Sequence, residues 1–313
     1  MSMKNVFYKL ILLIFTVLTG CEQNLTLDLP EGQEQLVVEG HIEQDAPPVL
    51  ILTRTTPVFS AFNAEELAGN FVHNANIVVS TQGRDYTLQE VPSPAFSEAM
   101  RQAVSAQLSI PEQLLISGSG FVVYVYTSDE LKGKLGETYK LRISHEGRTL
   151  TASTTIPQLN PIDSLWTVPH PDAAQDSLVT LYYRYNDPDT LGNSIRYFTK
   201  RNSEPYYPGY FTSVFNDELI NGGTISFPLE RGEPKGQAEL DQDKYGYFGK
   251  GDTITVRWAA IDIAHFRFWS SLEAEQSNNG SPVGSPGAVQ SNISGGYGIW
   301  GGYAVTYHTL VVQ

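Results

Sequence analysis

Three aspartates around residue 245 have the spacing that comes closest to a metal site. Asp241, Asp243 and Asp252 stand at positions one, three and twelve of a calcium-loop pattern, with Gly246 available for the turn. A calcium ion needs several oxygen ligands held together by such a loop. However, Tyr245 stands where an oxygen donor is required, and Asp252 replaces the usual bidentate glutamate. These aspartates are weak metal candidates, and the pattern favours a solvated acidic loop without a bound metal.

The histidines and serines form no local catalytic motif. The six histidines are scattered, and the closest pair, His145 and His170, is 25 residues apart. The sequence contains neither His-Glu-x-x-His nor Gly-x-Ser-x-Gly, the signatures of zinc proteases and of nucleophile elbows. A catalytic triad assembled from distant residues would leave no such signature. We therefore expect a protein that is not an enzyme and that carries no cofactor.

Aromatic residues gather in three segments that also contain glycine or proline, at 206–211, 245–248 and 297–300. Tyrosine and tryptophan combine a large apolar ring with a polar group, which suits contact with a protein partner or with a sugar or peptide. The alternative is that these rings only cover the rim of a β-sandwich. The candidate contact residues are Tyr206, Tyr207, Tyr210, Tyr247, Tyr297 and Trp300.

The only cysteine, Cys21, follows the only strongly apolar stretch of the chain. That stretch, residues 10–18, is about half as long as a membrane-spanning helix must be, so residues 1–20 are predicted to be a signal peptide. The sequence Leu-Thr-Gly-Cys at 18–21 resembles the lipobox of bacterial lipoproteins, where cleavage precedes attachment of acyl chains such as palmitate to the cysteine. We expect Cys21 to anchor the mature chain in lipid, with residues 21–34 as a tether.

The charge of the chain excludes one class of partner. The net charge is −14, and removing residues 1–20, which hold two lysines and no acidic residue, leaves −16. Nucleic-acid binding needs a basic surface, so we expect no nucleic-acid partner. Anionic lipid head groups would also repel this body. Attachment to a membrane would therefore depend on the acyl anchor.

The patterning predicts two β-rich domains. Residues 35–157 contain short segments that alternate or are apolar throughout, separated by turn residues, which indicates a β-sandwich. The expected strands are at 36–42, 49–54, 77–81, 86–90, 121–126, 139–144 and 149–155. An insertion at 92–117 interrupts them. Ser97 is placed to cap a short helix whose Met100, Val104 and Leu108 share one face.

Two prolines, at 157 and 161, mark the expected domain boundary. The second domain, 162–313, has expected strands at 178–185, 195–200, 224–229, 253–260 and 303–312. A helix near 261–276 has Ile261, His265 and Trp269 in one apolar stripe. Residues 280–302 are predicted to be a loop because they are rich in glycine, proline and serine.

Ten short segments, taken in order and spacing, resemble the "domain of unknown function 4249" lipoproteins of Bacteroidota over essentially the whole chain. The matching residues are 21–22, 27–30, 36–40, 161–165, 186–197, 215–218, 221–222, 251–253, 291–296 and 301–303. The insertion at 92–117 departs from the family pattern. The resemblance supports two β-sandwich-like domains of the immunoglobulin or transthyretin kind, with a helical insertion in the first and one helix in the second.

The resemblance implies a location on the outer membrane, beside TonB-dependent transporters. The expected function is that of a surface-exposed, lipid-anchored accessory or substrate-capture subunit of an outer-membrane β-barrel protein, held to the membrane lipid through acylated Cys21. The alternative is a stand-alone adhesin or glycan-binding lipoprotein. The family carries no established catalytic residues, so none is transferred to this chain.

Overall fold

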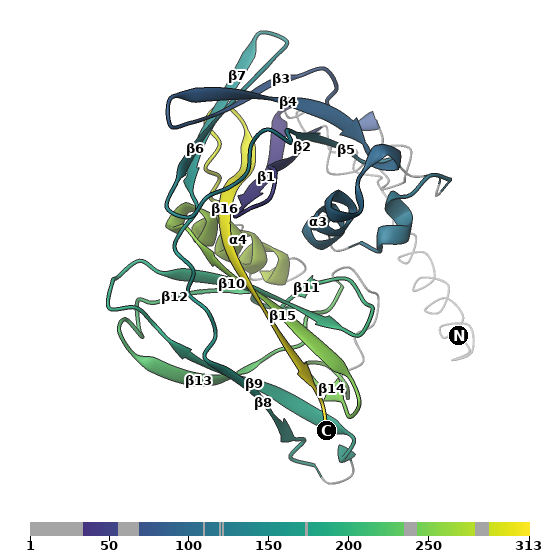
Figure 1. Ribbon diagram of the computed structural model, residues 1–313, viewed down its shortest axis with the longest axis vertical. Helices are drawn as coiled ribbons and strands as arrows, with labels where there is room; N and C mark the ends of the chain where they lie inside the picture. Colours follow the sequence, from purple (N-terminus) through teal and green to yellow (C-terminus); the bar gives the residue numbers. More distant parts are fainter. Residues whose placement is uncertain are drawn as a thin grey trace, which may run out of the picture. The chain divides into compact units, whose positions relative to one another are not determined.

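The structure is a computed structural model that describes residues 34–55, 69–108, 110–118, 120, 122–172, 175–234, 243–278 and 288–313. The predicted signal peptide and Cys21 lie outside the described residues. Strands are the main regular secondary structure of the described chain, and this confirms the predicted mainly β fold class (Figure 1). Within the described ranges, no helix combines the length and the apolar character needed to cross a membrane.

The strands in the first half of the chain are β1 (Leu36–Glu43), β2 (Val49–Arg54), β3 (Asn76–Thr81), β4 (Arg84–Pro92), β5 (Tyr124–Thr127), β6 (Thr138–His145) and β7 (Arg148–Thr155). Those in the second half are β8 (Ser164–Pro169), β9 (Leu178–Asn186), β10 (Ser194–Arg201), β11 (Tyr207–Pro208), β12 (Val214–Asn216), β13 (Thr224–Leu229), β14 (Phe248–Gly249), β15 (Thr253–Ile261) and β16 (Tyr297–Val311). The helices are α3 (Glu98–Leu108), α4 (Ile263–Asn278) and the short 3-10 helices η1 (Ser93–Ala95) and η2 (Glu112–Leu115).

One large sheet runs through both halves of the chain. Its strand order is β11-β10-β15-β16-β1-β2-β5-β4-β3-β6-β7, and β12 pairs with β10. Strand β16 joins the two halves, because it pairs in parallel with β1 and antiparallel with β15. In Figure 1 it is the long yellow strand that reaches from one group of strands to the other. Any side chain on this strand therefore has neighbours from both ends of the sequence.

The two predicted domains share this sheet. No strand occurs between residues 156 and 163, so the connection lies where the two prolines place it. Contacts nevertheless place Glu34–Gln313 in one unit, and the main core takes side chains from both sides of the connection. Independent folding of 35–157 and 162–313 remains a prediction, and separate fragments would have to fold without the pairing of β1 with β16.

A smaller sheet forms the second layer of the C-terminal half. Its order is β13-β9-β14, with β8 also paired to β9. Tyr183 and Tyr185 of β9 pack against Trp258 of β15, with ring centroids 5.1 and 5.6 Å apart. The Trp258 indole N–H donates to the backbone oxygen of Asn160 at 2.9 Å. The two layers thus form a sandwich whose buried tryptophan keeps its polar group satisfied.

The insertion at 92–117 contains the expected helix. The Ser97 hydroxyl accepts a hydrogen bond from the Met100 N–H at 3.2 Å, as a helix N-cap does. Met100 and Val104 are buried in a core cluster that also contains Val49 of β2. One face of α3 is therefore packed onto the large sheet, and the insertion belongs to the folded body.

Replacing Ser97 with alanine is expected to lower the free energy of unfolding by about 1 kcal/mol, because the Met100 N–H would lose its acceptor. Urea unfolding followed by circular dichroism measures this change. Ser203→Ala, in an exposed turn, is the control and should leave the midpoint unchanged. Equal stability of the two variants would show that the cap contributes nothing.

The prediction of a loop over 280–302 is wrong in its last part, because β16 begins at Tyr297. Strand β16 pairs there with β1, which lies near the other end of the sequence. Gly298 has a φ of +106°, and a Cβ on it would lie 1.8 Å from the Val38 carbonyl oxygen. Glycine is thus required for close strand packing rather than for a flexible loop. Trp300 is consequently a strand residue, with an exposed fraction of 0%.

Candidate functional site

Alternation along β1 divides its side chains between the two faces of the large sheet. Val38 and Ile42 point into the main core, whereas Glu39, His41 and Glu43 line the opposite face. On a two-layer sandwich such a face is normally in contact with water. In this protein, residues of α3 and α4 line the same space as these three side chains. The polar face of β1 is therefore enclosed.

The register of the sheet brings side chains of β10, β15 and β16 to the same face. Tyr303 of β16 is paired with Glu43, and Phe198 of β10 is paired with Arg257 of β15. Arg196 lies two residues before Phe198 and so shares its face. Strands that are far apart in the sequence thus bring two arginines and two aromatic rings beside β1.

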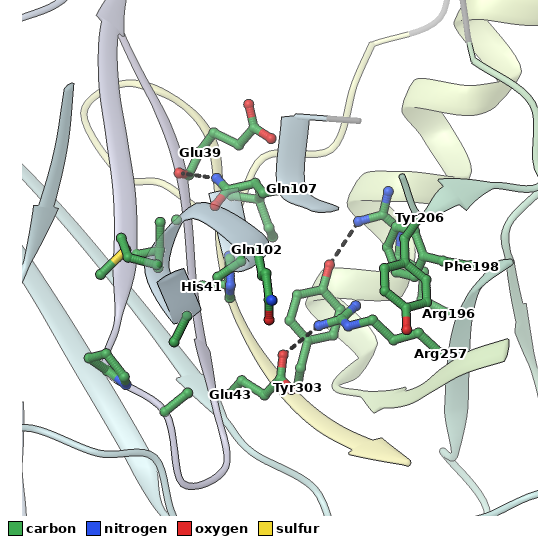
Figure 2. Close-up of a pocket in the computed structure, with 18 of the residues that line it drawn as sticks. Glu39, His41, Glu43, Gln102, Gln107, Arg196, Phe198, Tyr206, Arg257 and Tyr303 are labelled. Carbon is green, nitrogen blue, oxygen red and sulfur yellow. Dashed lines mark hydrogen bonds and ion pairs between the residues drawn. The ribbon is translucent and has the colours of Figure 1, made fainter. Parts of the chain in front are cut away.

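Together these elements enclose a cavity of about 460 Å³. Figure 2 shows Glu39, His41, Gln102 and Gln107 on one side and Arg196, Phe198, Tyr206 and Arg257 on the other. The further lining residues are Gly40, Glu43, Ala46, Pro47, Val49, Ser97, Ala99, Met100, Ala103, Asp129, His265, Trp269, Ile299, Tyr303 and Tyr307. The volume is within the range typical of small-molecule sites.

Arg257 forms the ion pair of the cavity. Its Nη2 lies 2.5 Å from Oε2 of Glu43, and its guanidinium is 5.0 Å from the Phe198 ring centroid and 4.9 Å from that of Tyr303. Burial by itself lowers the pKa of Arg257, but the Glu43 carboxylate outweighs it and the net shift is upward. The Arg257 guanidinium is therefore charged, and it packs against both rings.

Arg196 has a different environment. Its Nη1 donates to the Tyr303 hydroxyl at 2.7 Å, and its Nε donates to Ser213 Oγ at 3.4 Å. The guanidinium carbon lies 3.3 Å from a ring centroid of Trp269 and 4.6 Å from that of Phe198. Arg196 forms no ion pair with any carboxylate among the described residues, although only 6% of it is exposed.

The helix α4, which confirms the second predicted helix, begins directly after β15 because Asp262 caps it. One Asp262 oxygen accepts from the His265 N–H at 2.8 Å, and the other accepts from the Thr154 hydroxyl of β7 at 2.5 Å. Ile261, which the apolar pattern placed in the helix, is the last residue of β15. The cap fixes the first turn of α4, which contains His265, and Trp269 lines the cavity from the next turn.

Gly301 leaves room for the ring of His265 because it has no side chain. A Cβ at this glycine would lie 2.2, 2.4 and 2.6 Å from three atoms of the imidazole. The His265 ring also packs 4.5 Å from Tyr303, whose other neighbour, the His41 ring, is at 5.5 Å. The two histidines and Tyr303 thus form a continuous cluster of rings in the wall of the cavity.

Both histidines of the cavity are held in the neutral form. The pKa of His41 is lowered to about 3. Burial is the largest cause, and repulsion from Arg257 and Arg196 adds to it. Burial and repulsion from Arg196 also lower the pKa of His265 well below its usual value. Burial raises the pKa of Glu39, against the opposing effects of Arg196 and Gln107. The shared cause is desolvation in a space where the arginines supply the fixed charge.

Three polar atoms at the cavity are buried without a hydrogen-bond partner among the described residues. They are Oε1 of Gln107, Nδ1 of His265 and Nε1 of Trp269. Buried polar groups in folded proteins are almost always partnered. The Gln107 oxygen can only accept a hydrogen bond and the Trp269 nitrogen can only donate one. These atoms lie in the wall of the cavity, where the described residues leave them unpaired.

The predicted aromatic contact residues lie in different parts of the structure. Tyr206 lines the cavity, and Tyr207 is half-buried in β11. Tyr210 packs with Phe211 and Tyr245, and Tyr247 packs against His170 with ring centroids 4.4 Å apart. Tyr297 is exposed, whereas Trp300 belongs to the core. The aromatic segments therefore do not act as one surface, and only Tyr206 belongs to the cavity.

The weak metal candidates do not assemble into a site in the described part of the chain. Asp241 lies outside the described residues. Asp252 accepts hydrogen bonds from the Gly249 N–H and from the Asn202 side chain, both at 2.8 Å, so it organises a turn. No group of three possible metal ligands occurs among the described residues, which include Asp243.

The model of one protein family, described as "Domain of unknown function (DUF4249)", matches residues 22–309. The chain belongs to this family. The match includes every residue that lines the cavity, from Glu39 to Tyr307. No curated protein matches the chain. The description of the DUF4249 family states no activity, and the cavity is the feature of the described structure that points to a function.

Apart from Tyr206, the residues that line this DUF4249 cavity were not predicted as contact residues from the sequence. Two signals were present in the sequence. Arg257 stands between Val256 and Trp258, in a strand with no other charged residue, and a buried charge needs a partner. His265 and Trp269 lie on the apolar stripe of α4, where the pattern indicated ordinary core packing.

Proposed function

We propose that this DUF4249 protein is a non-enzymatic, lipid-anchored capture protein on the surface of the bacterial outer membrane. It binds a small molecule in the cavity and serves an outer-membrane β-barrel, of the TonB-dependent transporter kind, as an accessory or substrate-capture subunit. The observation that carries the proposal is the cavity of about 460 Å³, lined by buried charged and aromatic side chains. Cavities of this size with a few convergent polar groups are typical of ligand sites.

The state of the cavity residues favours binding over catalysis. A general base must be able to take up a proton near the working pH, and His41, with a pKa lowered to about 3, holds none at neutral pH and has little affinity for one. The Glu43 carboxylate is committed to Arg257 at 2.5 Å. What remains is a set of fixed donors, acceptors and rings, which is what recognition requires.

The proposal is tested on the intact, tagged lipoprotein, extracted from its native membranes in mild detergent. We expect a β-barrel protein to co-purify and native mass spectrometry to show a bound small molecule. Ala103→Trp, which fills the cavity from α3, should remove the small molecule while the melting temperature and the barrel are retained. Ala95→Trp, an exposed position in η1, is the matched control and should change neither.

Other outcomes would change the conclusion. Recovery of the barrel by a Cys21→Ser form that still fractionates as an acylated protein would refute the anchor. Recovery of no barrel, together with binding to a glycan array, would favour the adhesin alternative. The surface cluster of Tyr210, Phe211 and Tyr245, whose rings pack edge to face at 5.2 to 5.9 Å, would be the site to mutate in that case, because Phe211 is 55% exposed.

A further inference from the structure

Arg196 has hydrogen-bonding capacity that the protein itself does not use. A guanidinium has five N–H donors. The Tyr303 hydroxyl and Ser213 Oγ accept from one Nη1–H and from Nε–H. The remaining three N–H groups, including both on Nη2, have no acceptor among the described residues. Because Arg196 lines the cavity, these donors are available to a molecule bound there.

Two carboxylates beside the partners of Arg196 are engaged by other groups. Glu43 is paired with Arg257 at 2.5 Å. Glu273 accepts from the Ser213 N–H at 2.8 Å and from Ser213 Oγ at 2.5 Å, so the serine lies between this carboxylate and the Arg196 guanidinium. A buried cation without a counter-ion is costly unless a partner is supplied. The unfilled partner is an anion on the cavity side.

The other ionisable groups around the cavity do not neutralise this charge fully. His41 and His265 are neutral, and the carboxyl of Glu39 is pushed toward its neutral form by burial. Asp129 is exposed. In an acidic protein, with a net charge of −14 over the full chain, Arg196 is therefore a buried cation at the cavity that forms no ion pair with a carboxylate of the described residues. An anion that can leave water would supply the missing partner of this guanidinium.

We propose that the cavity binds a small organic carboxylate, whose negative group pairs with the unused N–H groups of Arg196. This inference rests on the capture function proposed above and names its ligand class. The rings of Trp269 and Phe198 hold the guanidinium in place, and Met100 and Ile299 offer apolar surface to the body of the ligand.

A single negative charge fits this site better than two. Arg257 is already neutralised by Glu43, so Arg196 is the one cation of the described cavity lining that lacks a carboxylate partner. Carboxylate and guanidinium also match as planar groups that share two hydrogen bonds. A phosphate dianion would bring a second charge for which the lining offers no further cation.

The test uses the full-length lipidated chain in detergent micelles. The probes are phenylacetate, 3-phenylpropionate and indole-3-acetate, each compared with its uncharged amide by isothermal titration calorimetry and ligand-observed NMR. The acids are expected to bind about tenfold or more tightly than the amides, because charge-assisted hydrogen bonds are the stronger ones. Arg196→Gln should remove this preference. Arg142→Gln, an exposed arginine on β6, should retain it.

A second variant keeps Arg196 in place and decides the question if Arg196→Gln does not fold. Gln102 is exposed on α3 and lines the cavity, so Gln102→Glu adds a negative charge without removing a core contact. This variant should bind the acids severalfold more weakly than the parent protein does and bind the amides with unchanged affinity. Equal effects on acids and amides would overturn the assignment.

The outcomes separate this inference from the function on which it rests. Equal binding of acids and amides would refute a carboxylate ligand but not the capture function. The same holds if folded Arg196→Gln still prefers the acids to the amides. Tighter binding of phenyl phosphate than of phenylacetate would refute the preference for a ligand with a single negative charge. A molecule that co-purifies with the protein and has no acidic group refutes the carboxylate as well. If no probe binds and no molecule co-purifies, both proposals fail.

Discussion

Replacing Trp300 with alanine is expected to lower the free energy of unfolding by about 3–5 kcal/mol, the usual cost of removing a large aromatic side chain from a core. The exposed fraction of Trp300 is 0%, and its indole N–H donates to the Tyr139 backbone oxygen at 3.1 Å. The ring also lies over Gly40, where a Cβ would be 2.9 Å from Trp300 Cε3. Its loss would therefore leave a void and remove this hydrogen bond.

Tyr297→Ala is the matched control for this prediction. Tyr297 lies in the same strand, three residues earlier, but is 56% exposed, and surface substitutions typically change stability by less than about 0.5 kcal/mol. Urea unfolding at neutral pH, followed by near- and far-ultraviolet circular dichroism, measures both variants. If the Trp300 variant were as stable as the Tyr297 variant, the burial of Trp300 in the sheet would be wrong.

The two residues also show which parts of this fold can be predicted from sequence. Alternation in β6, with Tyr139, Leu141 and Ile143 inside, is a local pattern, and the structure buries these three side chains. The capping of α3 by Ser97 is equally local. The first half of β16 has no such pattern, because its glycines are set by close contact with β1. Such contacts between distant segments leave only a weak trace in the local sequence.

The candidate site was missed for a related reason. Glu39, His41 and Glu43 alternate with apolar residues and so have the pattern of a solvent-exposed face. That face is covered by α3, which belongs to the insertion, and by α4. A polar residue in a strand pattern indicates only that it points away from one core. Whether it meets water or a second layer depends on elements elsewhere in the chain.

The two buried histidines should make the protein sensitive to mild acid. Below pH 6.5 the unfolded chain protonates both His41 and His265, whereas the folded protein keeps them neutral, since burial and the arginines lower both pKa values, that of His41 to about 3. The unfolded state then binds more protons, so stability falls as the pH falls. The stabilisation is fully present above pH 6.5 and is lost progressively below it.

The expected loss is about 2 kcal/mol for each histidine between pH 8 and pH 5, or about 4 kcal/mol for the pair. Glu39 acts in the opposite direction, because its raised pKa lets the folded state take up a proton first, and it offsets part of this loss near pH 5. Urea unfolding at half-unit pH steps measures the slope of stability against pH.

Variants at single histidines identify the source of that slope. His41→Gln removes one titrating group from the cavity and should reduce the mean slope between pH 6.5 and pH 5 by about 1 kcal/mol per pH unit. Ser203→Ala, in an exposed turn, removes no titrating group, so it is the control and should leave the slope as in the parent protein. A parent protein whose stability is constant from pH 8 to pH 5 would mean that the histidines are reached by water or protonated in the fold. The neutral, arginine-dominated cavity would then have to be abandoned.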